Sequence, residues 1–163
     1  MYLKHELFII VEPTQTDILH LVALYNNASV MQFIPQKKIL WNIKLVEEKI
    51  NKFKNPPKGI YIIKSLDHKF IGEASVFQHH EPDTLEIGFI LHADFWNKGL
   101  GTLVCSALID YCLHDLGTHR VIARMYKDNI GSQKVCRKAG MTLVKETTQD
   151  FTLNRLTYII YKK

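Results

Sequence analysis

A short loop with two glycines, residues 94–104 (DFWNKGLGTLV), carries the clearest chemical potential in the sequence. Gly99 and Gly101 lie at its centre, and an apolar stretch with helical spacing follows at once. Glycine costs conformational entropy on folding, so its use at the start of a helix requires a compensating gain. Exposed backbone N–H groups and the positive end of a helix dipole together suit an anion such as phosphate. The loop therefore predicts a helix start that binds phosphate.

Two common phosphate-binding loops do not fit this stretch. A Walker A loop places Lys-Ser/Thr after its glycines, whereas Lys98 precedes them. A dinucleotide-binding loop needs a third glycine where Val104 stands, together with a strand that opens a parallel βαβ unit. A tight turn that only needs glycine remains as the alternative.

The tripeptide His79-His80-Glu81 contains residue types that bind metals. Neighbouring side chains of a strand point apart, and the sequence has no HExxH motif. We therefore expect a surface turn here and no metal site.

The three cysteines, Cys105, Cys112 and Cys136, form no CxxC pair and cannot all pair with one another. This pattern indicates reduced thiols in a reducing compartment. Cys105 and Cys112 lie two helical turns apart on one apolar face, so we expect them in the core.

The periodicity of apolar residues and the turn signals predict the elements that must position these residues. Helices are expected over 18–25, 43–53, 102–116 and 129–139, and strands over 5–11, 60–66, 70–77, 84–92, 119–126, 142–148 and 155–161. Gly88, inside the strand 84–92, marks a bulge or a bend. Short turns between the middle strands disfavour a doubly wound parallel sheet. The expected fold is a single α+β domain over residues 1–163, in three α/β/α layers around a mixed, mostly antiparallel sheet.

Two motifs in this order of elements resemble the signatures of the GCN5-related N-acetyltransferase (GNAT) superfamily. In LHADFWNKGLG, Trp96, Lys98 and Gly99 match the first signature, and Asn97 replaces a glycine. The second signature appears as Asn129, Ser132, Gly140 and Met141. Within the superfamily the sequence is similar to the RimJ/RimL branch of ribosomal-protein N-terminal acetyltransferases, with the spermidine acetyltransferases nearby. The resemblance spans essentially the whole chain and implies the GNAT fold.

The resemblance also implies where acetyl-CoA binds. The backbone amides of residues 97–102 would hold its pyrophosphate, and a bend at Gly88 would splay that strand from its neighbour to receive the pantetheine arm. Backbone N–H groups near Phe89 to Leu91 could polarise the thioester carbonyl. The implied cofactor-binding residues are Phe89, Ile90, Leu91, Trp96, Asn97, Lys98, Gly99, Leu100, Gly101, Thr102, Asn129, Ser132 and Cys136.

Acetyl transfer to an amine requires a neutral amine, a polarised carbonyl and a protonated leaving thiolate. A lysine-like amine, with a pKa of about 10.4, costs roughly 4.6 kcal/mol to neutralise at pH 7, whereas an α-amine near 7.8 costs only about 1 kcal/mol. Glu86, on the strand with the bend, is the candidate base, directly or through water; the alternative is an outward-facing strand glutamate. His92 is a second candidate for proton relay, and the alternative is that it shapes the turn.

The last predicted helix supplies the candidate acid. Ser132, Val135, Cys136 and Ala139 fall on one of its faces. Many members of the superfamily place a tyrosine where Cys136 stands, so this chain departs from that pattern. We expect Ser132 to donate a proton to the departing sulfur and Cys136 to pack in the core. Asn129 would cap this helix or hold the pantetheine arm.

Composition limits the remaining classes of function. The 163 residues carry a formal charge of +5, and seven lysines lie between Lys37 and Lys58. A solvated helix face explains these lysines without nucleic acid, and the multiply phosphorylated cofactor suits the basic charge. The run Leu7–Val11 is too short for a signal peptide or a membrane span, so we expect a cytoplasmic protein without a membrane partner.

Taken together, the sequence predicts an acetyl-CoA-dependent N-acetyltransferase that transfers the acetyl group directly in a ternary complex. The expected acceptor is the α-amine of a protein or peptide, and a polyamine or another small amine is the second choice. The alternatives from other classes are a non-catalytic acyl-CoA-binding module and a basic RNA-binding domain. Monomer and homodimer both stay open.

Overall fold

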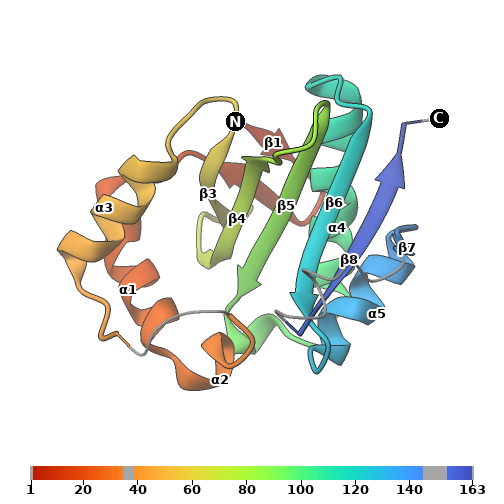
Figure 1. Ribbon diagram of the computed structural model, residues 1–163. Helices are drawn as coiled ribbons and strands as arrows, with labels where there is room; N and C mark the ends of the chain where they lie inside the picture. Colours follow the sequence, from red (N-terminus) through yellow and green to blue (C-terminus); the bar gives the residue numbers. More distant parts are fainter. Residues whose placement is uncertain (1, 35–38, 145–153, 163) are drawn as a thin grey trace. The chain divides into compact units, whose positions relative to one another are not determined.

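The computed structural model describes residues 2–34, 39–144 and 154–162 (Figure 1). The chain divides into two compact units, which are described separately. Unit 1 comprises residues 1–75 and 89–97, and unit 2 comprises residues 76–88 and 98–163. The strands β4 (Phe70–Gln78) and β5 (Thr84–Leu91) each contribute residues to both units. A single domain over residues 1–163 stays a prediction.

Within the described residues the strands follow the order β1-β2-β3-β4-β5-β6-β8-β7. The pairs β1–β2, β2–β3, β6–β8 and β7–β8 are antiparallel, whereas β5–β6 is parallel. The other strands are β1 (Leu3–Lys4), β2 (Phe8–Val11), β3 (Gly59–Ser65), β6 (Arg120–Tyr126), β7 (Thr142–Leu143) and β8 (Arg155–Tyr161). The predicted fold class, α+β with a mixed and mostly antiparallel sheet, is confirmed.

The helices of the described residues also follow the predicted order. They are α1 (Ile18–Asn26), α2 (Ala28–Met31), α3 (Ile43–Phe53), α4 (Leu100–Asp110) and α5 (Ile130–Lys138). The predicted helix 102–116 begins two residues earlier than expected, as α4. A π-helical turn, Tyr111–Asp115, extends α4, so the hydrogen-bond pattern changes before the helix ends. No helix in the described ranges is long and apolar enough to cross a membrane.

Three boundaries differ from the sequence prediction. The expected strand 5–11 is instead a hairpin of β1 and β2, because the amide of His5 donates to the carbonyl of Phe8 and closes a turn. The short α2 was not predicted; Asn27 both ends α1 and accepts a hydrogen bond from the amide of Val30. Of the strand expected over 142–148, the structure describes β7 and Val144, and residues 145–148 lie outside the described residues.

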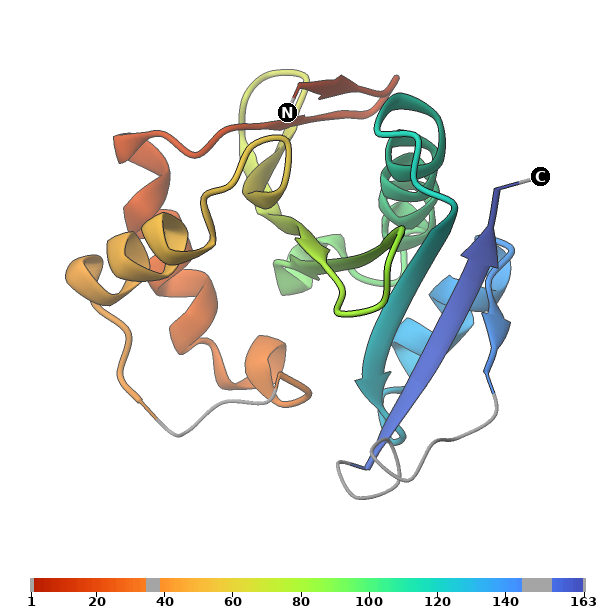
Figure 2. The ribbon, with the colours of Figure 1, turned by 45° about the horizontal axis from the view of Figure 1, so that its top comes forward.

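Unit 1 is built around an apolar cluster beneath α1. Ile18, Leu21, Leu24 and Tyr25 of α1 are buried in this cluster with Val30, Val46 and Ile62. In both views α1 and α3 lie beside each other (Figures 1 and 2). On α3, Val46 is buried and Ile50 is half-buried, whereas Ile43 and Phe53 at its two ends are exposed.

A buried carboxylate fixes the start of α1 to β3. Asp17 accepts hydrogen bonds from the amide and hydroxyl of Thr14, and its other oxygen lies 2.7 Å from Nζ of Lys64. Burial acts to raise the pKa of Asp17, but the hydrogen bonds from Lys64 and Thr14 outweigh burial and hold the pKa below its ordinary value. This pairing sets where the chain enters α1.

A second buried ionic cluster joins α1 and α3 to β4 within unit 1. The carboxylate of Glu73 accepts a hydrogen bond from the hydroxyl of Tyr25 and lies 3.1 Å from Nζ of Lys49. The Lys49 ammonium also donates to the Tyr25 hydroxyl at 2.7 Å and lies over the rings of Tyr25 and Trp41. The side chains of Lys49 and Glu73 are only 18% and 6% exposed, so each charge depends on its partner.

Unit 2 is built on the long antiparallel ladder of β6 and β8. The ladder runs from Arg120 opposite Tyr161 to Tyr126 opposite Arg155. The helices α4 and α5 lie on the same side of this pair of strands (Figures 1 and 2). The side chains that fill unit 2 are apolar and fully or almost fully buried, and they include Val104, Cys105, Leu108, Cys112, Val121 and Tyr158.

Replacing Lys49 with methionine should destabilise the protein by about 3 kcal/mol, because Glu73 would remain as a buried charge without its cation. The matched control is Lys44→Met on the same helix, which removes an exposed pair with Glu48 and should cost less than about 1 kcal/mol. Urea unfolding of both variants measures the difference. Equal losses of unfolding free energy in the two variants would show that the buried pair contributes no more to stability than the surface pair.

Candidate functional site

The start of α4 has the geometry of an anion site. Gly99 is the residue before the helix and has a φ of +78°, a left-handed conformation that favours glycine. An added Cβ at Gly99 would find no heavy atom within 4 Å, so the conformation and not the space selects glycine. Within the described part of the chain, the amides of Lys98, Gly99, Leu100 and Gly101 have no protein acceptor. The amide of Thr102, which the sequence placed in this set, instead donates to the carbonyl of Gly99 at 3.0 Å.

Asn97 explains how the chain departs from the family signature. Its φ is +59°, so it lies in the left-handed region. Asparagine tolerates this region better than most other residues with a side chain, because its short polar group bonds locally. The exchange of glycine for asparagine therefore keeps the backbone path of the loop. The residues from Trp96 to Gly99 are exposed.

The segment before the loop is fixed to the end of β5. The indole N–H of Trp96 donates to the carbonyl of Leu91 at 2.9 Å. The amide of His92 donates to the carbonyl of Ile71, and the imidazole of His92 accepts from the amide of Asp94. His92 therefore shapes the turn, as the alternative interpretation expected; a role in proton transfer stays a prediction. Contacts of Trp96, Phe89, Ile90 and Leu91 with a cofactor also stay predictions.

Glu86, the predicted base, is held by an arginine. Its two carboxylate oxygens accept from Nε and Nη2 of Arg124 at 3.0 and 2.6 Å. Both side chains are about three-quarters buried, so this bidentate pair is partly shielded from water. Both carboxylate oxygens of Glu86 are therefore occupied by the guanidinium group.

The parallel ladder between β5 and β6 is short. It runs from Thr84 opposite Arg120 to Glu86 opposite Ile122 and ends two residues before Gly88. Gly88 itself has no positive φ, so the strand continues through it without a left-handed residue. The separation of the strands beyond Gly88 stays a prediction.

Helix α5 begins at the second sequence motif, as predicted. The side chain of Asn129 accepts from the amide of Ser132 at 3.0 Å, which confirms its role as the helix cap. Ser132 is half-buried, and its hydroxyl makes no hydrogen bond with another described residue. The hydroxyl is therefore available to a ligand. Its role in protonating a thiolate, and contacts of Asn129 with a cofactor, stay predictions.

The three cysteines are all free and buried. A hydrogen bond with Cys136, followed by burial, raises the pKa of Cys105, and burial raises the pKa of Cys112 to about 12. Both therefore stay protonated thiols at neutral pH. Cys136 is 3% exposed, which is the core position expected for it. A contact of Cys136 with the cofactor stays a prediction.

Sequence reasoning missed the buried carboxylate of Glu73. It lies inside FIGEASVF, an otherwise small and apolar strand. A charged residue is rarely buried without a partner, so a lone glutamate in such a strand was the signal that a cation and a hydrogen-bond donor had to face it. Both partners come from helices far away in the sequence, which the strand pattern could not identify.

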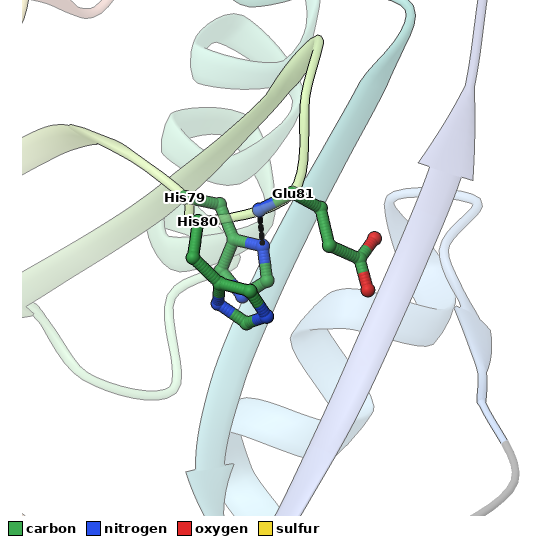
Figure 3. A group of neighbouring side chains, drawn as sticks. All are labelled: His79, His80 and Glu81. Carbon is green, nitrogen blue, oxygen red and sulfur yellow. Dashed lines mark hydrogen bonds between the residues drawn. The ribbon is translucent and has the colours of Figure 1, made fainter.

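The tripeptide His79-His80-Glu81 lies in the turn between β4 and β5 (Figure 3). The expectation that the two imidazoles point apart is wrong, because β4 ends at Gln78 and strand alternation no longer applies. Their ring centroids lie 3.9 Å apart. Burial, followed by electrostatic interaction with His80 and with Arg124, lowers the pKa of His79.

The lysine-rich segment offers less basic surface than its composition suggests. Lys49 is buried against Glu73, and Lys44 pairs with Glu48. Lys37 and Lys38 lie outside the described residues. These pairings agree with the interpretation that the lysines belong mainly to helix α3 and its surroundings.

Comparison with known proteins identifies the family. The model of the acetyltransferase (GNAT) domain matches residues 8–142, which is most of the chain. The chain belongs to the GNAT acetyltransferase family. The N-acetyltransferase YnaD of Bacillus subtilis (strain 168) is 28% identical over 121 residues, which cover 71% of this chain and 68% of YnaD.

Two solved structures show the same GNAT fold. Spermidine N-acetyltransferase from Vibrio cholerae, in complex with CoA and spermine, has a TM-score of 0.82 and 15% identity, and 95% of each chain is covered. Ribosomal-protein-S5-alanine acetyltransferase from Vibrio fischeri has a TM-score of 0.76 and 15% identity, and 100% of this chain and 97% of that chain are covered. Both likenesses concern the fold, and the resemblance to the ribosomal-protein branch stays a prediction.

Proposed function

We propose that this GNAT protein is an acetyl-CoA-dependent N-acetyltransferase that acetylates the α-amine of a protein or peptide by direct transfer in a ternary complex. The family match over residues 8–142 supports acetyl transfer to an amine. The observation that carries the cofactor assignment is the helix start of α4, where four consecutive amides lack a protein acceptor within the described residues. A pyrophosphate would supply the missing acceptors.

The pairing of Glu86 supports an acceptor that needs little help from a base. Both carboxylate oxygens of Glu86 already accept hydrogen bonds from Arg124, so direct removal of a proton from the acceptor amine by Glu86 competes with this pair. An α-amine costs about 1 kcal/mol to neutralise at pH 7, which a weak base or a water relayed by Glu86 can accommodate. A lysine or polyamine nitrogen costs roughly 4.6 kcal/mol and requires a stronger base.

A polyamine acceptor is the second candidate, favoured by the likeness to a spermidine acetyltransferase structure. The formal charge of +5 argues against it, because a basic protein repels a polycation from a distance. The same basic charge attracts coenzyme A. An acyl-CoA-binding module without catalysis would share the cofactor site but not the chemistry.

Ser132 is the proposed acid. Its hydroxyl has no hydrogen-bond partner among the described residues and follows the cap of α5, which fixes its backbone through Asn129. It would donate a proton to the sulfur of coenzyme A as the carbon–sulfur bond breaks, while the amine loses its proton to Glu86 or to water. The cytoplasm, which supplies acetyl-CoA and reduced thiols, is the proposed location.

The variants Gly99→Ala and Gly117→Ala test the cofactor loop. Both glycines have left-handed φ values, +78° and +69°, and neither has a heavy atom within 4 Å of an added Cβ. Each variant should therefore lose a similar ~1–2 kcal/mol of stability, the order of magnitude for a side chain in that region. Only Gly99→Ala should bind coenzyme A more weakly, by about tenfold, in calorimetry. Equal affinities of the two variants for coenzyme A would contradict the assignment of the loop.

The variants Glu86→Gln and Ser132→Ala test the chemistry. Each should lower kcat/KM by about 100-fold, the low end for general acid–base catalysis, with little change in the affinity for acetyl-CoA. The assay follows free thiol release with peptides that have a free α-amine, and Glu48→Gln on the surface of α3 is the control. Turnover within twofold of the wild type in both variants would remove these residues from the mechanism.

The pH dependence with the wild-type protein separates the two acceptor classes. With an α-amine, kcat/KM should rise with pH and level off near about 7.8, because only the neutral amine attacks. With spermidine or a lysine side chain it should still rise above about pH 9, because those amines stay mostly protonated there. Higher kcat/KM at pH 7.5 for spermidine than for every peptide would reverse the order of the two candidates.

A further inference from the structure

The turn between β4 and β5 brings together three side chains with ligand atoms for a transition metal. His79, His80 and Glu81 each offer one nitrogen or oxygen atom, and these atoms all lie within 4.8 Å of one another. Among the described residues this is the one such group of three or more His, Cys, Asp or Glu side chains. Figure 3 shows the two imidazoles close together and the Glu81 side chain extending from the same turn.

We propose that His79, His80 and Glu81 form a binding site for a divalent first-row transition metal of the Zn²⁺ and Ni²⁺ type. Two imidazoles and one carboxylate are a donor set that Zn²⁺ accepts, with a fourth position left for water. Imidazole nitrogen suits Zn²⁺, Ni²⁺ and Cu²⁺, whereas Mg²⁺ and Ca²⁺ prefer oxygen ligands. This site is independent of acetyl transfer and of the cofactor loop.

The turn is held in place by neighbouring residues of unit 2. The amide of His79 donates to the carbonyl of Thr84, which closes the turn between the two strands. The carbonyl of Asp83 accepts from the amide of Arg120 and from the hydroxyl of Thr118, and the Asp83 carboxylate accepts from the amide of His119. Much of the entropy cost of ordering three ligands is therefore already met by the fold.

Arg120 positions the carboxylate of Glu81. Its Nη1 donates to Oε2 of Glu81 at 3.1 Å, and its Nη2 donates to the carbonyl of Pro82 at 2.8 Å. A carboxylate has two oxygens, so one can stay with the arginine while the other faces a metal. The guanidinium charge opposes a dication, which predicts binding of moderate rather than high affinity.

Metal binding requires small movements and the loss of one weak contact. Ligand atoms around Zn²⁺ lie about 2.0–2.2 Å from the metal, so the three ligand atoms must close in from their present spacing. Nδ1 of His79 accepts a long hydrogen bond, 3.2 Å, from the amide of Glu81. Binding through Nδ1 displaces this amide, and binding through Nε2 moves the ring proton to Nδ1. Either route gives up only this contact. His80 and Glu81 are exposed, so solvent leaves room for their side chains to adjust.

The test is calorimetric titration of the tag-free full chain with ZnCl₂ and NiCl₂. The expected result is one site of moderate affinity per chain, weakened at least tenfold in His79→Gln and in His80→Gln. The control is His114→Gln, an exposed histidine on the π-helical turn, which should titrate like the wild type. Because His80 is exposed, its replacement should leave the melting temperature of the metal-free protein unchanged.

Glu81→Gln separates a three-ligand site from a pair of histidines. A loss of affinity of about fivefold or more supports ligation by the carboxylate, and affinity equal to or above that of the wild type overturns the three-ligand site. The whole proposal is overturned if the wild type binds neither metal at about 1 mM, a concentration that detects even weak binding. It is equally overturned if His79→Gln/His80→Gln binds as tightly as the wild type.

Discussion

The constraint on which the proposed chemistry depends is the set of unpaired backbone amides at the start of α4. A helix start always leaves N–H groups without partners, and a protein must satisfy them with a side-chain cap, with water or with a ligand. Here the capping residue is Gly99, which has no side chain to offer, and its left-handed backbone is exposed to solvent. Asn42 and Asn129 cap α3 and α5 with their side chains, and α1 continues directly from the short turn 15–17 without a side-chain cap. At the start of α4 the open amides follow an exposed glycine loop, which is where an anion fits.

The charged side-chain pairs of the two units differ in how far they are exposed to solvent. In unit 1, the charged pairs of Asp17 with Lys64 and of Glu73 with Lys49 are buried and complete, so they hold helices against strands. In unit 2, Glu86 is also paired, but about a quarter of its side chain stays exposed, and it lies on the strand that the sequence associates with the chemistry. A partly exposed ion pair can exchange partners at lower cost than a buried one. This difference supports a chemical role for Glu86 and a structural role for Glu73.

Sequence patterns were sufficient for the order of the longer helices and strands and for the position of the glycine loop, because these features depend on local physics. Apolar spacing located α1 and α3, and turn residues separated the middle strands. Asn97 shows the limit of motif matching. It replaces a glycine of the family signature, yet its backbone has the left-handed conformation that the loop requires. Sequence patterns could not predict contacts between segments that lie far apart in the chain. The pairing of Glu86 with Arg124 joins residues 38 positions apart, and the close approach of the His79 and His80 rings depends on where β4 ends.

The most direct test of the cofactor site follows the backbone amides themselves. With ¹⁵N-labelled protein, coenzyme A should shift the amide resonances of Lys98, Gly99, Leu100 and Gly101 strongly, because the pyrophosphate becomes their acceptor. Pantetheine, which has the thiol arm but no pyrophosphate, should leave these four resonances nearly unchanged at the same concentration. Two results would contradict this assignment: binding of coenzyme A without a shift of these four resonances, or an equal shift with pantetheine. Either result would mean that the start of α4 does not bind the pyrophosphate.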